Sequence, residues 1–354
     1  MKNSKLSLKE AMALFISESK DGKRRKTNGH PITASVIEQY IHVQQVIERF
    51  ETHEKKQYIL NLNCRPNTIE WEREKRYWKR FFTHFCHFTR HYSDSYRLAI
   101  IKVLRSVFNF LSGQKGYAVG SFHRSWTVDT WQAPPVVIMP ERLHFLIHDE
   151  LFRGGLSRSL QRVLDITVVG CTVGLRYSDL MALQPRHLRA DGGQVHLCVA
   201  TSKTGAGVQI PLPAYAVAIL ERYRKRGQKW LLPRLSNNQF NQQLKKIGNL
   251  AGWTEALPKY RSRKGRPFEI KDANGSSWPF YKHLSAHTMR RTAITTLLLL
   301  GVEEPVVRSL SGHAPGSREF YRYVAFVQSY LDRQVMDAHR RLMENPSCYR
   351  QPSL

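Results

Sequence analysis

Basic side chains in the second half of the sequence gather around a tyrosine-rich segment. Tyr321 and Tyr323 lie in that segment. The basic residues before it are Arg176, Lys203, His287, Arg290 and His313. When a tyrosine hydroxyl attacks a phosphodiester, the phosphorane that forms is anionic and needs fixed positive charge and hydrogen-bond donors around it. These residue types therefore indicate attack by a tyrosine on a phosphodiester.

The two arginines fall where helices are expected to begin. Arg176 follows Gly174-Leu175 and precedes Asp179, so its guanidinium can hold two non-bridging phosphate oxygens from a helix start. Considered alone, this stretch is better explained by a surface ion pair between Arg176 and Asp179. His287 and Arg290 are three residues apart and share one face of a predicted helix. Arg290 would be the second guanidinium, and His287 a donor or proton shuttle.

Lys203, His313 and a tyrosine complete the expected chemistry. Lys203 lies near the tip of a predicted hairpin, where lysines are common, and could donate a proton to the departing 5′ oxygen. Gly312 is expected to cap a short helix and turn His313 inward. A tyrosine hydroxyl has an ordinary pKa of about 10 and needs cations to stabilise its phenolate. The candidate nucleophiles are Tyr321, Tyr323 and Tyr330, although a half-buried core position is the ordinary alternative for any one tyrosine.

Apolar residues at helical spacing predict helices from about residue 7 to residue 117. Trp78, Phe82, Phe85 and Phe88 share one predicted helix, in which histidines recur at positions 84, 87 and 91. No separate acidic or cysteine ligand completes a metal site there, so we interpret these histidines as a polar stripe opposite an aromatic core.

Two proline clusters between Thr127 and Pro140 cannot lie inside a helix and predict a linker between two domains. Beyond it, helices are expected at 141–152, 160–169, 215–226, 238–251 and 287–300. Alternating apolar residues at 195–199 and 208–212 predict an antiparallel hairpin. The fold class is therefore mainly α with a small antiparallel β-sheet.

The net charge of +27 makes nucleic acids and acidic membranes the natural partners. A merely soluble or ribosome-associated basic protein remains an alternative at this level. The loop containing Lys23, Arg24, Arg25 and Lys26 is interpreted either as a phosphate-contacting segment or as a solvated linker.

Cysteine usage and apolar runs predict a cytoplasmic protein without a membrane partner. The five cysteines are scattered and never form a Cys-x-x-Cys pair, which favours a reducing compartment over disulfides or a zinc ribbon. No signal peptide is expected, and the apolar run at 297–300 is too short to span a bilayer. No phosphate-binding Gly-x-x-x-x-Gly-Lys loop and no carboxylate cluster for two metals is found, so no cofactor or metal is expected.

The order of these motifs resembles the tyrosine recombinase family, also called phage-type integrases. The resemblance covers residues 137–340 and, less specifically, the helical N-terminal part. It rests on Gly-Leu-Arg with the acidic residue Asp179, the hairpin Lys203, Ile210-Pro211-Leu212, His287-x-x-Arg290, and Leu310-x-Gly-His313.

The resemblance implies the two-domain tyrosine recombinase architecture. A helical core DNA-binding (SAM-like) domain would span residues 1–126, a linker 127–140, and an α+β catalytic domain with a C-terminal helix 141–354. Double-stranded DNA would lie in a C-shaped clamp, with a homotetramer on two recombination sites and accessory DNA-bending proteins as possible partners. The segment 327–343 would dock on a neighbouring protomer or pack within its own chain. The long basic stretch from Lys259 to Lys271 departs from the family pattern, and its residues Arg261, Arg263 and Lys264 are interpreted either as part of an extended DNA-facing loop or as part of a disordered insertion.

The implied activity is site-specific recombination through a 3′-phosphotyrosyl intermediate, serving integration and excision or inversion. The implied catalytic residues are Arg176, Lys203, His287, Arg290, His313 and a tyrosine. Arg322 occupies the family's usual nucleophile position, which is a departure. We predict Tyr323, because Phe320-x-x-Tyr323 reproduces the family pattern, with Tyr321 as the alternative. A type IB topoisomerase-like enzyme and a catalytically inactive DNA-binding protein are the rival interpretations.

Overall fold

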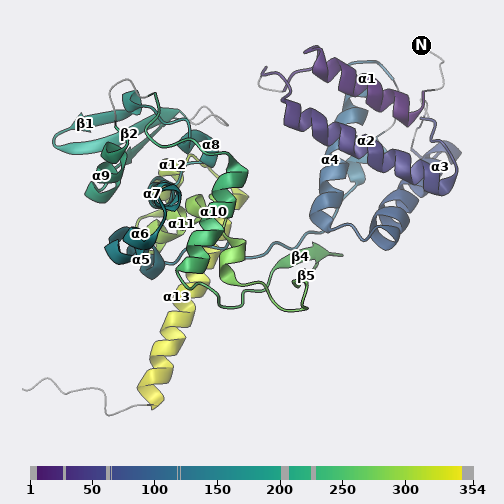
Figure 1. Cartoon of the computed structure of the whole chain (residues 1–354). Helices are drawn as coiled ribbons and strands as arrows, with labels where there is room; N and C mark the ends of the chain where they lie inside the picture. The colour runs from purple at the N-terminus through teal and green to yellow at the C-terminus, as the bar shows by residue number, and fades with distance from the viewer. Residues whose placement is uncertain are drawn as a thin grey trace, which may run out of the picture. The chain divides into compact units, whose positions relative to one another are not determined.

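The computed structural model describes residues 6–26, 29–60, 64, 66–117, 119, 121–200, 207–224 and 229–344. The chain divides into two compact units, one formed by Met1–Ala133 with Tyr260–Ile270 and the other by Pro134–Lys259 with Lys271–Leu354. Helices dominate both units, and the strands form small antiparallel sheets (Figure 1). The predicted fold class is therefore confirmed.

The first unit packs its helices around an aromatic core. Its elements are α1 (Leu8–Lys20), α2 (Ala34–Glu54), α3 (Ile69–Lys79), the π-helix η1 (Arg80–Thr89), α4 (Asp94–Gly113), the 3-10 helix η2 (Phe122–Ser125) and the strands β4 (Tyr260–Arg263) and β5 (Arg266–Glu269). Ser7 caps α1, because its hydroxyl oxygen accepts from the Glu10 amide while the Glu10 carboxylate accepts from the Ser7 amide. Phe15, Phe50 and Trp78 are fully buried in the centre.

The π-helix η1 overturns two details of the predicted aromatic helix. Phe82 and Phe85 are buried as expected, but Phe88 is 52% exposed and His87 is only 6% exposed. A π-helix hydrogen-bonds with i→i+5 spacing, so its wider turn rotates later residues away from the positions that α-helical spacing assigns. His87 therefore does not belong to a polar stripe. In the part of the chain that the structure describes, no group of three His, Cys, Asp or Glu side chains could hold a metal ion.

The basic segment from Lys259 to Lys271 contains the β4–β5 hairpin, with Tyr260 paired to Glu269 and Arg263 to Arg266. The alternative of a disordered insertion is therefore wrong. The hairpin clusters with the first unit, although both flanking segments belong to the second. Its strands are short and rich in arginine, so the apolar alternation that predicts a strand is absent there.

The second unit combines a three-stranded antiparallel sheet with helices. Its elements are α5 (Pro140–His148), α6 (Glu150–Gly155), α7 (Arg158–Val173), α8 (Tyr177–Leu180), η3 (Pro185–His187), β1 (Leu188–Asp191), β2 (Gln194–Ala200), β3 (Gly207–Pro211), α9 (Ala214–Arg222), α10 (Asn237–Leu250), η4 (Phe280–His283), α11 (Ala286–Leu299), α12 (Glu304–Leu310) and α13 (Arg318–Glu344). The predicted hairpin is confirmed as β2–β3, with Leu197 opposite Ile210. Strand β1 adds to its free edge. No described helix is long and apolar enough to cross a membrane.

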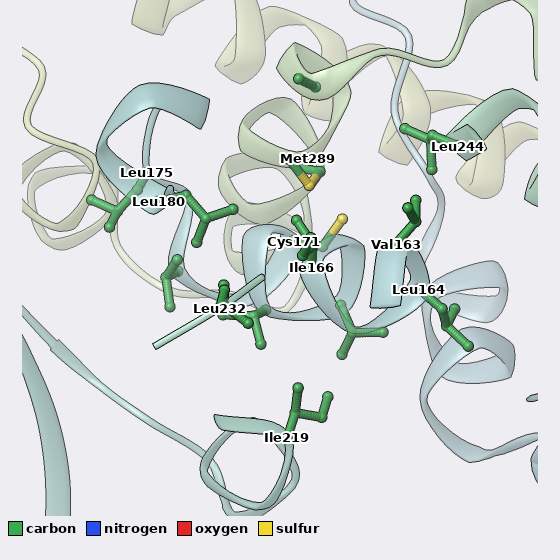
Figure 2. Close-up of a cluster of buried hydrophobic side chains, with 14 of the residues drawn as sticks. Val163, Leu164, Ile166, Cys171, Leu175, Leu180, Ile219, Leu232, Leu244 and Met289 are labelled. Atoms are coloured by element: carbon green, nitrogen blue, oxygen red, sulfur yellow. The ribbon is translucent and has the colours of Figure 1, made fainter. Parts of the chain in front are cut away.

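Helix α7 runs through the core of this unit, and α11 packs directly on it (Figure 2). The two backbones approach closely because Gly170 faces Met289. A Cβ on Gly170 would lie 2.5 Å from the Met289 sulfur, so a larger residue would push α11 away. This contact fixes the end of α7 relative to α11, from which the candidate site is built.

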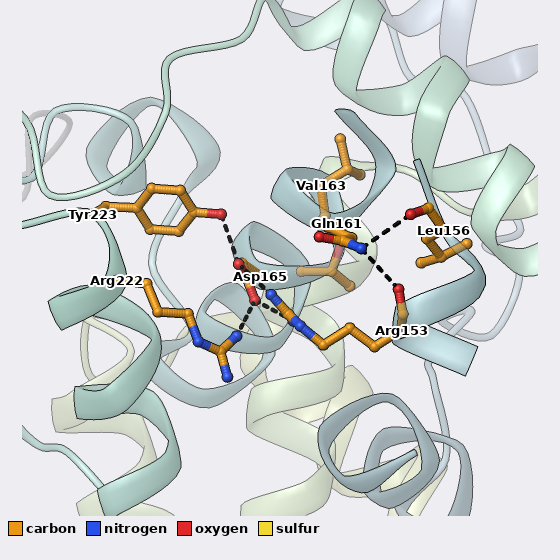
Figure 3. A network of polar contacts seen from close by, with 8 residues as sticks. Arg153, Leu156, Gln161, Val163, Asp165, Arg222 and Tyr223 are labelled. Carbon is orange, nitrogen blue, oxygen red and sulfur yellow. Dashed lines mark hydrogen bonds and ion pairs between the residues drawn. The ribbon is translucent and has the colours of Figure 1, made fainter. Parts of the chain in front are cut away.

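A buried carboxylate ties α7 to its neighbours (Figure 3). Asp165 has no exposed surface and accepts from Arg153 at 2.6 and 3.0 Å, from Arg222 at 3.1 Å and from the Tyr223 hydroxyl at 2.6 Å. Replacing Asp165 with alanine is expected to lower the free energy of unfolding by about 3–5 kcal/mol, because it leaves the Arg153 charge without its partner. Urea denaturation measures the loss. A loss below about 1 kcal/mol would show that this network contributes nothing net.

Glu74 makes the stability of the first unit depend on pH. The residue is 4% exposed, and its carboxylate accepts a hydrogen bond from the Trp78 indole N–H at 3.3 Å. Burial raises its pKa from 4.5 to about 8. The folded state therefore binds this proton more tightly than the unfolded state. The contribution of this proton to the free energy of unfolding is complete below pH 4.5 and is lost as the pH rises to about 8.

The neutral substitution Glu74→Gln removes that loss. It is expected to raise the free energy of unfolding by about 2–3 kcal/mol at pH 7 and by little at pH 5. Thermal unfolding of both proteins at several pH values between 5 and 8 measures the difference. A gain that stays constant over this range would contradict the assignment of the effect to the Glu74 proton.

Candidate active site

The end of α7 and the start of α11 place two arginines side by side in the second unit. Gly174 ends α7 with φ +64°, and its missing Cβ would lie 3.2 Å from the Cβ of Ala293 on α11. Glycine suits this position because it adopts a positive φ without strain and has no Cβ to crowd Ala293. The Gly174 carbonyl accepts from Nη1 of Arg290 at 2.9 Å. Two residues later Arg176 caps the N-terminus of α8, as its helix-start position predicts.

Arg290 is held rigidly in the core of the site. It is 3% exposed, and its Nη2 donates to the Ser311 carbonyl at 2.6 Å. The same nitrogen lies 3.3 Å from Nδ1 and 3.2 Å from Nε2 of His313. Burial, and then the positive charge of Arg176, lower the pKa of Arg290 to about 10. The site thus holds a buried guanidinium with a second positive charge close to it.

Arg176 has unused hydrogen-bonding capacity. Its Nη1 is buried, yet it has no hydrogen-bond partner among the described residues. Buried donors in folded proteins are almost always paired, so an unpaired guanidinium nitrogen requires an explanation. Within the described residues, Arg176 and Arg290 thus bring two guanidinium groups close together and leave one buried donor, Nη1 of Arg176, unpaired.

Two histidines lie in the field of these arginines. Gly312, with φ +61°, follows α12 and turns the chain at His313, as predicted. Nδ1 of His313 lies 2.8 Å from the Ser311 hydroxyl oxygen. Burial, followed by Arg290 and Arg176, lowers the pKa of His313 to about 4. His287 is exposed in the first turn of α11, and desolvation followed by Arg291 and Arg290 also lowers its pKa.

The structure separates the three tyrosine candidates on α13. Tyr323 is 4% exposed, and its ring centroid lies 6.2 Å from that of His313. Burial raises the pKa of Tyr323, while Arg291 and Arg290 act in the opposite direction. Tyr321 is 49% exposed and lies beside Arg308, whose guanidinium carbon is 5.5 Å from the ring centroid. Tyr330 is two helical turns beyond Tyr323, a separation of about 10 Å along the axis.

The structure therefore brings Arg176, His287, Arg290, His313 and Tyr323 together. Lys203 lies outside the described residues. Sequence reasoning gave no role to Arg291, whose charge acts on both Tyr323 and His287. Its position directly after Arg290 in a run of basic residues is the one signal that could have identified it.

The basic residues predicted to contact DNA differ in their surroundings. Lys23, Arg25 and Lys26 are exposed. Arg24 is directed inward instead, with its guanidinium carbon 3.5 Å from the Phe15 ring centroid and Nη1 2.6 Å from the Ser19 hydroxyl. These contacts occupy Arg24, so it is removed from the predicted set. Arg261 and Lys264 are exposed on the β4–β5 hairpin, and Arg263 is half-buried there.

Comparison with known proteins identifies a family and a fold. Residues 162–327 match the model of the phage integrase family. No curated protein sequence matches the chain. Among solved structures, the XerH site-specific recombinase bound to its palindromic difH substrate has a TM-score of 0.57 at 14% identity, covering 94% of this chain and 85% of that chain.

Two further structures have the same fold. A lambda integrase dimer bound to a COC′ core site gives a TM-score of 0.57 at 13% identity over 90% of this chain and 77% of that one. The Tn1549 transposon integrase with circular intermediate DNA gives 0.56 at 14% identity over 90% and 95%. The chain thus carries a domain of the phage integrase, or tyrosine recombinase, family, and the resemblance stated from its motifs is confirmed.

Proposed function

We propose that the protein is a site-specific DNA recombinase that cleaves and rejoins DNA through a 3′-phosphotyrosyl intermediate. The observation that carries the proposal is the pair Arg176 and Arg290: one buried guanidinium nitrogen has no partner among the residues that the structure describes, and the two charges repel each other. A phosphodiester between them would accept from the unpaired donor and neutralise the repulsion. The tyrosine recombinase domain supports this choice of ligand.

In the proposed reaction, the Tyr323 oxygen attacks the scissile phosphorus as the bond to the 5′ oxygen breaks. The Tyr323 hydroxyl gives its proton to the neutral imidazole of His287, and Lys203 supplies a proton to the departing 5′ oxygen. Arg176 and Arg290 stabilise the additional negative charge of the phosphorane. The phosphate would also raise the pKa of His313 from about 4, so that this residue can donate a hydrogen bond. The 3′-phosphotyrosyl ester conserves the bond energy, and a 5′ hydroxyl from a partner duplex completes strand exchange.

The proposed assembly is a homotetramer on two recombination sites. Support comes from the second half of α13, where Leu331, Val335 and Met336 are 41%, 56% and 65% exposed. Such side chains would gain from packing against a neighbouring protomer. Double-stranded DNA would contact Lys23, Arg25, Lys26 and the β4–β5 hairpin, with DNA-bending proteins as possible accessories. A cytoplasmic location fits this role.

Covalent trapping tests the proposal. Labelled duplex fragments from the source genome are incubated with the protein and denatured in detergent, and the DNA that remains attached is sequenced. A recombinase is expected to capture a short recurrent sequence. Plasmids carrying two copies of that sequence should then recombine. Relaxation of supercoils without recombination would favour a topoisomerase-like enzyme, and the absence of any adduct would favour an inactive DNA-binding protein.

A further inference from the structure

One buried carboxylate fixes the basic turn of the β4–β5 hairpin within the first unit. Asp94, at the start of α4, has no exposed surface and accepts from the Ser262 hydroxyl, from the Lys264 amide at 3.0 Å and from the Gly265 amide at 2.9 Å. Lys264 and Gly265 have φ values of +55° and +71°, as a tight two-residue hairpin turn requires. Burial opposes ionisation of Asp94, but these hydrogen bonds outweigh it and keep its pKa below the ordinary value.

The turn forms a basic pocket with the π-helix η1. The pocket has a volume of about 670 Å³ and is lined by His87, Phe88, His91, Arg263, Lys264 and Arg266. These lining side chains comprise three cations, two imidazoles and a phenyl ring, with no carboxylate. Because Asp94 holds the backbone of the turn, the turn itself needs little ordering on binding. The lining is therefore suited to an anion.

His87, one of the residues that line the pocket, has an unsatisfied polar atom. The residue is only 6% exposed, and its Nδ1 has no hydrogen-bond partner among the described residues. The charged groups that act on it are Arg97 and Asp94 from α4 and Lys264 and Arg263 from the hairpin. Burial and then the three cations lower its pKa, and Asp94 opposes them. An anion in the pocket would reverse this balance and favour the protonated imidazole.

We propose that this pocket binds one phosphate group of the DNA backbone and that binding places a proton on His87. The proposal rests on the proposed function for the identity of the ligand as DNA. Arg263, Lys264 and Arg266 supply the positive charge, and protonated His87 adds a hydrogen bond that is available only while phosphate is present. The contact is therefore stronger at lower pH, unlike an ordinary lysine–phosphate contact.

The salt dependence of DNA binding distinguishes a shared phosphate site from scattered surface charges. The full chain is titrated with a fluorescent duplex of random sequence, and the slope of log K against log salt is measured. Lys264→Gln and the double variant Lys264→Gln/Arg266→Gln are both expected to reduce the slope by about one, because one phosphate contact is lost in each. Scattered charges would reduce it by about two in the double variant, which would overturn the proposal. The exposed Lys56 of the same unit provides a control as Lys56→Gln, which should keep the full slope.

The pH dependence tests the role of His87. Affinity for the same duplex is expected to fall more steeply between pH 6 and pH 8 in the wild type than in His87→Gln, with thermal unfolding used to verify that the variant folds. Equal pH dependence in the wild type and in His87→Gln would overturn the proposed proton uptake. If His87→Gln does not fold, Lys264→Gln still tests the pocket.

Two outcomes separate this proposal from the recombinase function. If the wild type binds the duplex but the pocket variants leave the slope unchanged, the pocket assignment alone fails. If the wild type binds no duplex, the recombinase proposal fails with it.

Inorganic phosphate is added in a parallel titration at the concentration of DNA phosphate. It should leave DNA binding unchanged. If inorganic phosphate abolishes the difference in salt slope between the wild type and the pocket variants, the site is assigned to free phosphate instead.

Discussion

Tyr323→Phe is expected to abolish the covalent protein–DNA adduct, whereas Tyr321→Phe should retain it within about twofold of the wild type. The phenylalanine ring preserves the packing of Tyr323 against His313 and Phe320 and removes only the attacking oxygen. Without that oxygen no phosphotyrosyl bond can form. Tyr321 is 49% exposed beside Arg308, and it has no role in the proposed reaction, so loss of its hydroxyl should leave the adduct intact.

The two tyrosine variants are assayed on a nicked duplex built from the captured sequence, with attached DNA measured after denaturation. They are matched controls for each other, because both keep an aromatic ring on α13. The reverse result, with adduct lost only in Tyr321→Phe, would assign the nucleophile to Tyr321. Loss in both variants would instead require a rearrangement of α13 when DNA binds.

The sequence predicts the second unit more accurately than the first, for physical reasons. Helices α7 and α11 and the β2–β3 hairpin have regular apolar periodicity, and tertiary packing does not override it. In the first unit, the continuous helix around Phe82–Phe88 changes to a π-helix, which no residue spacing announces. The β4–β5 hairpin is also invisible in the sequence, since Asp94 stabilises it from far along the chain.

The residues of the candidate site are predictable as types, but their environments are not. The motifs place Arg176 just before a helix and Arg290 near the start of another, and the structure agrees, with Arg176 at the N-cap of α8 and Arg290 inside α11. Burial distinguishes the surroundings of Tyr321 and Tyr323, and it arises from packing of α13 that spacing alone left open. The inward packing of Arg24 on Phe15 is likewise a tertiary contact, which a run of basic residues does not reveal.

Arg176→Ala is expected to slow DNA cleavage by about 10²–10³-fold, the range observed when one donor to a developing oxyanion is removed. The same substitution should leave the melting temperature unchanged or raise it. Arg176 is half-buried with an unpaired Nη1, and its charge lowers the pKa of the buried Arg290. Removing the Arg176 guanidinium therefore relieves its repulsion with Arg290. It breaks no hydrogen bond at Nη1, because no described residue pairs with that atom. Loss of cleavage without loss of stability is expected for a residue that serves the reaction at a cost to stability.

Arg290→Ala provides the contrast, because Arg290 also donates to the carbonyls of Gly174 and Ser311. It should lose both cleavage and stability, since two buried acceptors lose their charged donor. Arg176→Lys should recover only part of the cleavage rate, because an ammonium cannot bind two phosphate oxygens as a planar guanidinium does. In Arg176→Ala the pKa of His313 should rise above about 4, which NMR titration of the imidazole measures. A fall of several degrees in the melting temperature of Arg176→Ala with cleavage unchanged would make Arg176 a structural residue and remove the central support for phosphate binding between the two arginines.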